Sequence, residues 1–396
     1  NAVPKCKVTS RKNAFNVKEE SISQYIVINY DKLNQSDTYV QIKKLSKIKI
    51  DYIILDEIHW AKSFSDANIS ARRKALIQLM KDAKKRNPGA KILGLSATPV
   101  VNNLQEGRSL LELMSGLEFT DLSTKATIPN AAAVYEKFTI HSVRQIPDYK
   151  NPKMNYVDVE ADISKDIPLR SLNKNPLAME HILTDARIPH IIKNIQGPTI
   201  IYTEYVGRVS FIDSPHLSKK IVNAVLSAGF SVAEFTGEDN SGLEKFKRGD
   251  VQVLVASRPI STGIDGLQKR CSNLIFNALP WTHAQYKQII GRIVRTGMKN
   301  ENVKITIIRA AISGYEYDQL KLNRLNFKRS LADCAVDGNL PEKNLVTPQA
   351  ATREAVKWLE RLEKGEISVI SRNELYEQLS PTEIKKRVKK YGDFEL

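Results

Sequence analysis

Short apolar runs alternate with amphipathic stretches along most of the chain. The runs are rich in β-branched residues and are bounded by polar residues, Gly or Pro, as the buried strands of a parallel sheet are. Between them lie helical patterns such as residues 70–86 and 216–229, the second ending at Gly229 where a helix stop is expected. The pattern predicts an α/β fold of right-handed units. Strands are predicted over residues 25–30, 51–57, 91–99, 198–205, 251–257, 273–278 and 303–310.

The alternation stops in two places. Residues 119–195 are rich in Asn, Pro, Asp and Lys, with one helical stretch in "NAAAVYEKFTIHSV", and we interpret them as a connection or insertion between two lobes. After about residue 325 the strands end, and residues 347–366 have the pattern of a Thr-capped amphipathic helix. The sequence therefore predicts an incomplete first lobe, a connection, a second lobe and a helical C-terminal extension over residues 1–118, 119–195, 196–325 and 326–396.

The composition favours a polyanionic partner. The 396 residues include 60 Lys and Arg against 44 Asp and Glu, a formal net charge of +16 at pH 7. Such an excess favours nucleic acid, although a membrane surface would also attract it. No apolar run approaches the roughly 20 residues that span a bilayer and no signal-peptide pattern begins the chain, so we expect an intracellular protein with no membrane partner. The three cysteines match no metal-ligand or disulfide spacing.

An acidic pair, Asp56 and Glu57, directly follows the apolar run "YIIL". The carboxyl end of a buried strand is where open α/β sheets place ligands. ATP hydrolysis needs one carboxylate near Mg²⁺ and a second that orients and deprotonates the attacking water. An acidic pair at the start of a helix would give the same local pattern. The pair alone leaves both interpretations open.

Two further motifs carry candidate chemistry. "LGLSATP" places Ser96 and Thr98 at another strand end, where their hydroxyls could hydrogen-bond the acidic site, although a turn would look the same. "QIIGRIVRTG" places Arg292 and Arg295 three positions apart, which predicts that they share one helical face. Such arginines can stabilise charge on a γ-phosphate in the transition state, or can simply be solvated.

In this order, the motifs resemble the Swi/Snf family of superfamily-two helicases, which are double-stranded DNA translocases. The resemblance covers about residues 22–310 and implies two RecA-like parallel-sheet lobes, the cofactors ATP and Mg²⁺, and double-stranded DNA as partner, with nuclease, methylase or other protein subunits as further partners. It rests on "YIILDEIH" with its DEAH-like box, "SATPVVNNLQEGRSLLELMSG", "ASRPISTGIDGLQ" and "NALPWTHAQYKQIIGRIVRTG".

The resemblance also implies roles for single residues. Asp56 would help to hold Mg²⁺, Glu57 would act on the attacking water, and His59, Ser96 and Thr98 would couple the nucleotide site to the second lobe.

In the second lobe, the resemblance makes Gln288, Arg292 and Arg295 a sensor of the nucleotide, with both arginines acting in catalysis. Gly263 and Asp265 would join the ATP and DNA contacts. The residues expected to contact nucleic acid are Arg144, Lys245 and Trp281.

The sequence departs from the family in its phosphate loop, because it contains no Gly-Lys dipeptide. We therefore expect the chain to lack the N-terminal part of a longer motor, and to be inactive without that loop; loss of ATPase function is the alternative. "STGIDGLQ" lacks the longer glycine and asparagine pattern of nucleosome remodellers, which favours a bacterial, phage or viral relative. Two other functions stay open: a strand-separating helicase or motor subunit of a restriction or defence system, and a non-catalytic DNA-binding scaffold.

Overall fold

The computed structural model describes two compact units of the chain. Residues 1–145 and 328–342 form the first unit, and residues 146–327 and 343–396 form the second. Apart from residue 364, the helix expected over residues 347–366 lies outside the described residues. The structure describes residues 6–10, 23–35, 37–62, 69–145, 152–161, 175–210, 215–237, 241–298, 302–312, 315–340 and 364.

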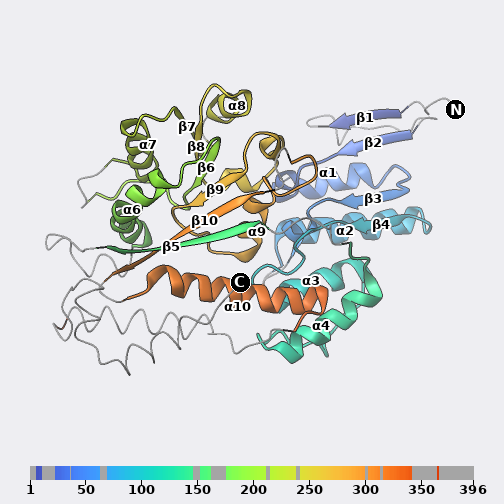
Figure 1. Ribbon diagram of the computed structural model, residues 1–396. Coiled ribbons are helices and arrows are strands. Elements are labelled where there is room, and N and C mark those ends of the chain that lie inside the picture. The colour runs from blue at the N-terminus through green and yellow to red at the C-terminus, as the bar shows by residue number, and fades with distance from the viewer. Residues whose placement is uncertain are drawn as a thin grey trace. The chain divides into compact units, whose positions relative to one another are not determined.

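Two pairs of parallel strands and a set of helices make up the first unit (Figure 1). Alternate side chains of β3, Ile53 and Leu55, are buried against α2, whose own start is capped by Ser70. The strands are β1 (Cys6–Ser10), paired with β2 (Ser23–Val27), and β3 (Tyr52–Leu55), paired with β4 (Lys91–Gly94). The helices are η2 (Tyr30–Asn34), α1 (Thr38–Leu45), η3 (Ile58–Ala61), α2 (Ala71–Arg86), α3 (Leu104–Ser115) and α4 (Ile128–His141).

The second unit is built on a six-stranded sheet in which every described pairing is parallel. In spatial order its strands are β5 (Lys153–Ala161), β10 (Lys304–Ile312), β9 (Asn273–Phe276), β6 (Thr199–Tyr202), β8 (Val253–Ala256) and β7 (Val232–Phe235).

Both faces of this sheet are covered, which explains why its central strands are apolar at consecutive positions. One face packs against α6 (Pro176–Lys193) and α7 (Leu217–Ser227). The other face packs against α8 (Ser241–Arg248), α9 (His283–Ile290) and the first half of α10 (Tyr317–Asp337) (Figure 1).

The predicted α/β class with parallel sheets is confirmed, and most differences concern strand ends. β3 and β4 stop at Leu55 and Gly94, so the acidic pair and the SATP residues lie in the loops that follow. The strand expected over 25–30 ends at Val27. β5 was not predicted, because it is an edge strand whose sequence "KMNYVDVEA" mixes polar and apolar residues.

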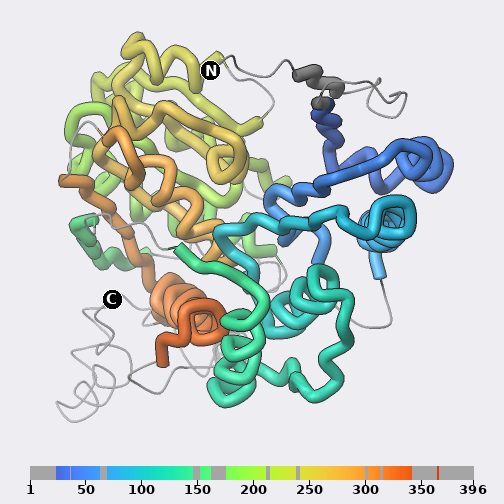
Figure 2. The backbone as a smooth tube through the Cα atoms, turned by 90° about the vertical axis from the view of Figure 1, so that its right-hand side faces the viewer, coloured from blue at the N-terminus to red at the C-terminus, as the bar shows by residue number. Residues whose placement is uncertain are grey.

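Within the predicted connection, α4 belongs to the first unit, whereas β5 and α6 belong to the second. In the first unit α4 packs beside α3, as Figure 2 shows in blue-green. No helix in the described ranges is long and apolar enough to cross a membrane.

Candidate functional site

Asp56 and Glu57 form a tight turn, here called the acidic turn, at the carboxyl end of β3. Its backbone is fixed to the segment after β4, because Ile58 N donates to Leu95 O and Leu95 N donates to Leu55 O, both at 2.9 Å. Glu57 has φ 48° and ψ 50°, and within the described ranges it is the one non-glycine residue with positive φ. This conformation costs about 1–3 kcal/mol and persists where surrounding contacts impose it, often at functional sites.

His59 connects the acidic turn to the SATP segment, residues 96–99. Its Nδ1 lies 3.1 Å from Glu57 Oε2 and 3.2 Å from Ser96 Oγ. Ser96 Oγ also accepts a hydrogen bond of 3.1 Å from Thr98 N. The buried Thr98 hydroxyl has no hydrogen-bond partner among the residues that the structure describes. The structure thus brings four of the predicted first-lobe residues into one chain of contacts that begins at Glu57.

A buried ion pair, which was not predicted from the sequence, joins the segment after η3 to α3. Lys62 Nζ, just after η3, lies 2.9 Å from Oε1 of Glu106, a side chain with no exposed surface. Glu106 Oε2 accepts from the backbone N–H groups of Val101 and Asn102, at 2.8 and 2.9 Å. The sequence signal was weak: Glu106 is the N3 residue behind the Asn103 cap, a position where Glu commonly serves the cap itself.

Tyr30 adds a phenol near the acidic turn. Burial, and secondly the charge of Asp56, raises the pKa of Tyr30 to about 12. The Arg72 guanidinium lies 5.6 Å from the centre of the Tyr30 ring and donates to Trp60 O at 3.1 Å. Tyr30 therefore stays protonated at neutral pH beside the negative charge of the turn.

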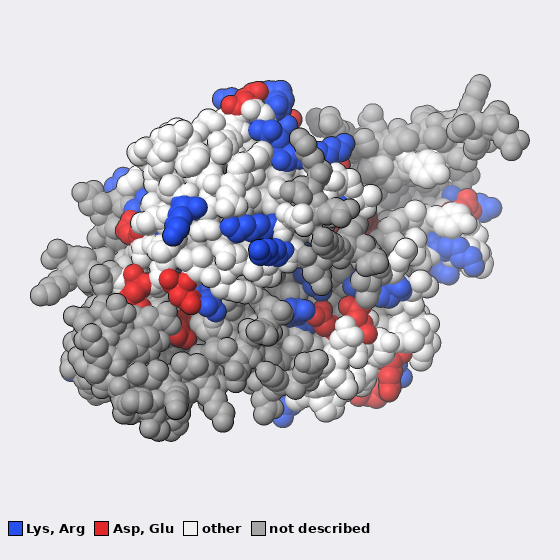
Figure 3. Space-filling model, viewed as in Figure 1, with Lys and Arg blue, Asp and Glu red and all other residues white. Residues whose placement is uncertain are grey.

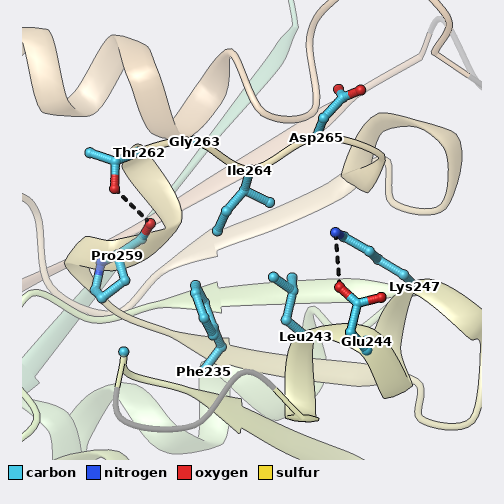
Figure 4. Close-up of a pocket in the computed structure, with 10 residues that line it drawn as sticks. Phe235, Leu243, Glu244, Lys247, Pro259, Thr262, Gly263, Ile264 and Asp265 are labelled. Carbon is cyan, nitrogen blue, oxygen red and sulfur yellow. Dashed lines mark hydrogen bonds and ion pairs between the residues drawn. The ribbon is translucent and has the colours of Figure 1, made fainter. Parts of the chain in front are cut away.

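In the second unit, a pocket of about 420 Å³ opens at the carboxyl ends of β7 and β8 (Figure 4). One wall is the glycine-rich loop, residues 257–266, and another is α8, where Lys247 Nζ lies 3.2 Å from Glu244 Oε1. Gly237, at φ 103°, faces Pro259 so closely that a Cβ would lie 2.7 Å from Pro259 Cγ. The lining residues are Phe235, Gly237, Leu243, Glu244, Lys247, Pro259, Thr262, Gly263, Ile264 and Asp265.

The prediction that Arg292 and Arg295 share a helical face is wrong. α9 ends at Ile290, and the chain then tightens into i→i+3 turns, with Arg292 N donating to Ile289 O at 3.1 Å. Gln288 lies within α9, two residues before that end.

The two arginines nevertheless converge on the glycine-rich loop. Arg292 donates from Nη1 to Ile264 O at 2.9 Å and from Nη2 to Ser261 O at 2.5 Å. Arg295 Nη1 lies 3.2 Å from Asp265 Oδ1. Hydrogen bonds from Gln268 and from Gly266 N lower the pKa of Asp265. Of the predicted residues, the structure thus groups Asp265 and both arginines, with Gly263 in the same loop.

The residues predicted to contact nucleic acid lie on three different segments of the two units. Arg144 lies in the first unit, where its Nε donates to Asp337 Oδ1 at 2.7 Å. Trp281, in the second unit, donates from Nε1 to Tyr205 Oη at 2.6 Å and has Lys321 Nζ 4.7 Å from its ring centre. Lys245 is exposed in the last turn of α8, with Lys247 and Arg248, and Figure 3 shows basic side chains gathered near the top of that view.

Comparison with solved structures gives loose likenesses. The helicase MrfA, a DUF1998 helicase bound to DNA and AMPPNP, is 13% identical with a TM-score of 0.46, over 88% of this chain and 42% of its own. A Dbp5 variant from S. cerevisiae, bound to RNA and ADP BeF3, is 14% identical with a TM-score of 0.42, over 90% of this chain and 73% of its own. The Hef helicase domain of Pyrococcus furiosus is 15% identical with a TM-score of 0.38, over 69% and 75%.

The chain therefore spans less than half the length of MrfA. A comparison with curated proteins found no match.

Two protein families match parts of the sequence. The helicase conserved C-terminal domain matches residues 183–297, in the second unit, and the family described as type III restriction enzyme, res subunit, matches residues 2–101, in the first. In this order, the two matches support a relation of this chain to helicase superfamily 2.

Proposed function

We propose that this chain works in a motor that couples ATP hydrolysis to movement along double-stranded DNA, as Swi/Snf-type translocases do. The observation that carries the proposal is the acidic turn. Glu57 is held in a strained left-handed conformation by the backbone of β3 and β4, and its carboxylate is held by His59. A catalytic carboxylate fixed in this way is pre-organised for its reaction.

Asp56 fits a magnesium ion. Mg²⁺ prefers oxygen ligands and is usually bound through one or two carboxylates together with the phosphates of the substrate. Asp56 supplies one exposed carboxylate at the strand end, and the described residues hold no cluster of three or more metal-ligating side chains. When bound, the ion would neutralise charge that develops on the phosphates.

The other residues act on water and charge. Glu57 would orient the attacking water and accept its proton. His59 holds the Glu57 carboxylate and connects it to Ser96 through a contact of the same ring nitrogen. Both terminal nitrogens of Arg292 donate hydrogen bonds to backbone carbonyls of the glycine-rich loop, so we assign Arg292 to holding that loop. Arg295, whose partner Asp265 is an exposed carboxylate, is then the better candidate to stabilise charge in the transition state.

ATP turnover also needs a phosphate-binding loop. These 396 residues contain no Gly-Lys dipeptide, so on this proposal another segment or subunit of the working motor supplies the loop. The alternative is a non-catalytic DNA-binding scaffold that keeps the two α/β units.

A second candidate is the motor subunit of a restriction system, and it is favoured by the match of residues 2–101 to the res subunit family.

Strand separation is tested against translocation with two substrates. On the natural full-length protein, ATP-dependent displacement of a third strand from a triplex, without unwinding of a duplex, supports translocation. Release of an annealed strand would instead support a strand-separating helicase.

A further inference from the structure

The second unit contains a buried carboxylate that none of the motifs above explains. Glu204 follows β6, and its side chain has no exposed surface. Its Oε1 accepts from Arg258 Nε at 2.6 Å, and its Oε2 accepts from the Tyr202 hydroxyl at 2.5 Å and from Gln285 Nε2 at 3.2 Å. A buried carboxylate is costly unless it is paired and hydrogen-bonded, and Glu204 is both.

The three partners of Glu204 come from three different segments. Tyr202 ends β6, at the centre of the sheet, and its own hydroxyl accepts from Gln285 Nε2 at 2.9 Å. Arg258 begins η4 (Arg258–Ser261), the first part of the glycine-rich loop. Gln285 lies in the first turn of α9. One carboxylate therefore joins the rigid sheet to both the loop and the helix.

Arg258 shows that the attachment depends on this ion pair. Its side chain is 62% exposed, so packing alone does not hold it, and both its Nε and its Nη2 bind the same oxygen of Glu204. Burial alone would lower the pKa of Arg258, but the hydrogen bond and the charge of Glu204 raise it, so the guanidinium stays charged. The start of the glycine-rich loop is thus held by the electrostatic attraction of Arg258 to the buried Glu204 carboxylate.

Downstream, the same loop and helix carry the catalytic candidates. α9 leads into Arg292, which binds the carbonyls of Ser261 and Ile264 in the loop, and then into Arg295, which pairs with Asp265. A shift of the loop at Arg258, or of α9 at Gln285, would therefore move the Arg295–Asp265 pair.

We propose that Glu204 is a positioning residue, which sets the place of the glycine-rich loop and of the arginine-bearing turns after α9 without touching the nucleotide. This inference rests on the proposed function for its catalytic consequence, but its structural part stands alone. Because a small misplacement of a catalytic group can cost up to about 10²-fold in rate, removing the charge of Glu204 should be visible in turnover.

The test uses the natural full-length protein with Glu204→Gln, which keeps the shape of the side chain and removes its charge. Tyr202→Phe removes one donor to the same carboxylate. The control is Glu180→Gln, at a carboxylate that is equally buried but pairs with Arg187 and Lys321 rather than with a residue of the glycine-rich loop. Two readouts are measured: hydrogen exchange of the amides of residues 258–266, and kcat and KM for ATP with duplex DNA.

We expect Glu204→Gln to speed exchange in the loop, and to lower kcat on the order of 10-fold or more with little change in KM, as loss of a transition-state interaction does. Tyr202→Phe should act in the same direction with a smaller effect. Glu180→Gln should lower the melting temperature but leave loop exchange and kcat unchanged.

Unchanged loop exchange in Glu204→Gln would overturn the inference. Faster exchange with unchanged kcat would also overturn it, since the loop would then move without consequence. If the unsubstituted protein shows no ATP hydrolysis, the proposed function fails, whereas the exchange measurement still decides whether Glu204 holds the loop.

Discussion

At the scale of single residues, Glu57 carries both the proposed water-activating carboxylate and the strained backbone of the acidic turn. Glu57→Gln keeps the size of the side chain and removes its basicity. Because general-base catalysis typically contributes about 10²–10⁴-fold, we expect ATP turnover of the natural full-length protein to fall by that factor. Duplex DNA binding, measured in the same buffer by fluorescence anisotropy, should be spared; unchanged turnover would remove Glu57 from the mechanism.

The strain itself predicts a change in stability. Gly adopts positive φ without steric cost, so Glu57→Gly should raise the free energy of unfolding by about 1 kcal/mol while turnover is lost. Glu57→Ala is the matched control, because Ala removes the carboxylate but keeps the Cβ that makes this conformation costly. Urea denaturation measures the free energy of unfolding of both variants. Equal stabilities for the Gly and Ala variants would show that the backbone of Glu57 stores no strain.

Residue positions at strand ends could be predicted from the sequence, whereas their partners could not. The apolar run "YIIL" locates Asp56 and Glu57 at a strand end, as the structure shows. The left-handed Glu57 could not be foreseen, since Glu has no local preference for that conformation. Glu106 and Glu204 were missed because their roles depend on Lys62 and Arg258, and the separation of each pair in sequence is arbitrary.

At the scale of elements, the turns after α9 separate the roles of the two arginines. Arg295→Ala should lower kcat by about 10³-fold if Arg295 stabilises transition-state charge, with little effect on stability because the pair with Asp265 is largely exposed. Arg292→Ala should also lower the melting temperature, since it releases the carbonyls of Ser261 and Ile264. The reverse pattern, in which only the Arg295 variant is unstable, would exchange the two assignments.

A buried charge cluster holds α6 to the start of α10. Arg187 has no exposed side-chain surface and lies 2.7 Å from both Glu180 Oε2 and Asp318 Oδ2. Burial alone would raise the pKa of Glu180, but Arg187 and Lys321 together lower it, so the carboxylate stays charged. Arg187→Met would leave the buried carboxylates of Glu180 and Asp318 without their shared positive partner. We expect it to destabilise the second unit by about 3–5 kcal/mol.

Chemical denaturation of the full chain checks this value. Lys247→Ala removes one partner of the i,i+3 pair with Glu244 and should cost no more than about 0.5 kcal/mol, which makes it the control for loss of an ordinary surface pair. A loss below about 1 kcal/mol for Arg187→Met would mean that the buried cluster contributes no more than a surface ion pair.

The strands that could be predicted from the sequence are those whose side chains are buried on both faces of the sheet. β6, β8 and β9 are buried on both faces, so their apolar runs are visible in the sequence. β5 lies at the sheet edge with polar positions, and its long pairing with β10 joins residues about 150 positions apart, which no local pattern records. The end of α9 at Ile290 was missed because the sequence after it keeps a helical period.

At the scale of the whole molecule, the net charge of +16 predicts binding to duplex DNA that is strongly dependent on salt. A protein that makes about six phosphate contacts loses about 10³-fold in affinity between 50 and 200 mM salt, and contacts of this kind carry no sequence information. We expect a slope of this size, shared by duplexes of unrelated sequence, when binding is titrated across that range. A shallow slope would show that phosphate contacts contribute little.

On the proposed function, this chain belongs to a motor that ATP hydrolysis drives along duplex DNA, with the acidic turn as the site of hydrolysis. The most direct test measures ATP hydrolysis by the natural full-length protein with duplex DNA, with single-stranded DNA and without DNA, each beside its Glu57→Gln variant. We predict turnover that duplex DNA stimulates most and that Glu57→Gln lowers by about 10²–10⁴-fold. Turnover that is absent, that responds only to single strands, or that Glu57→Gln leaves unchanged would contradict the proposed function.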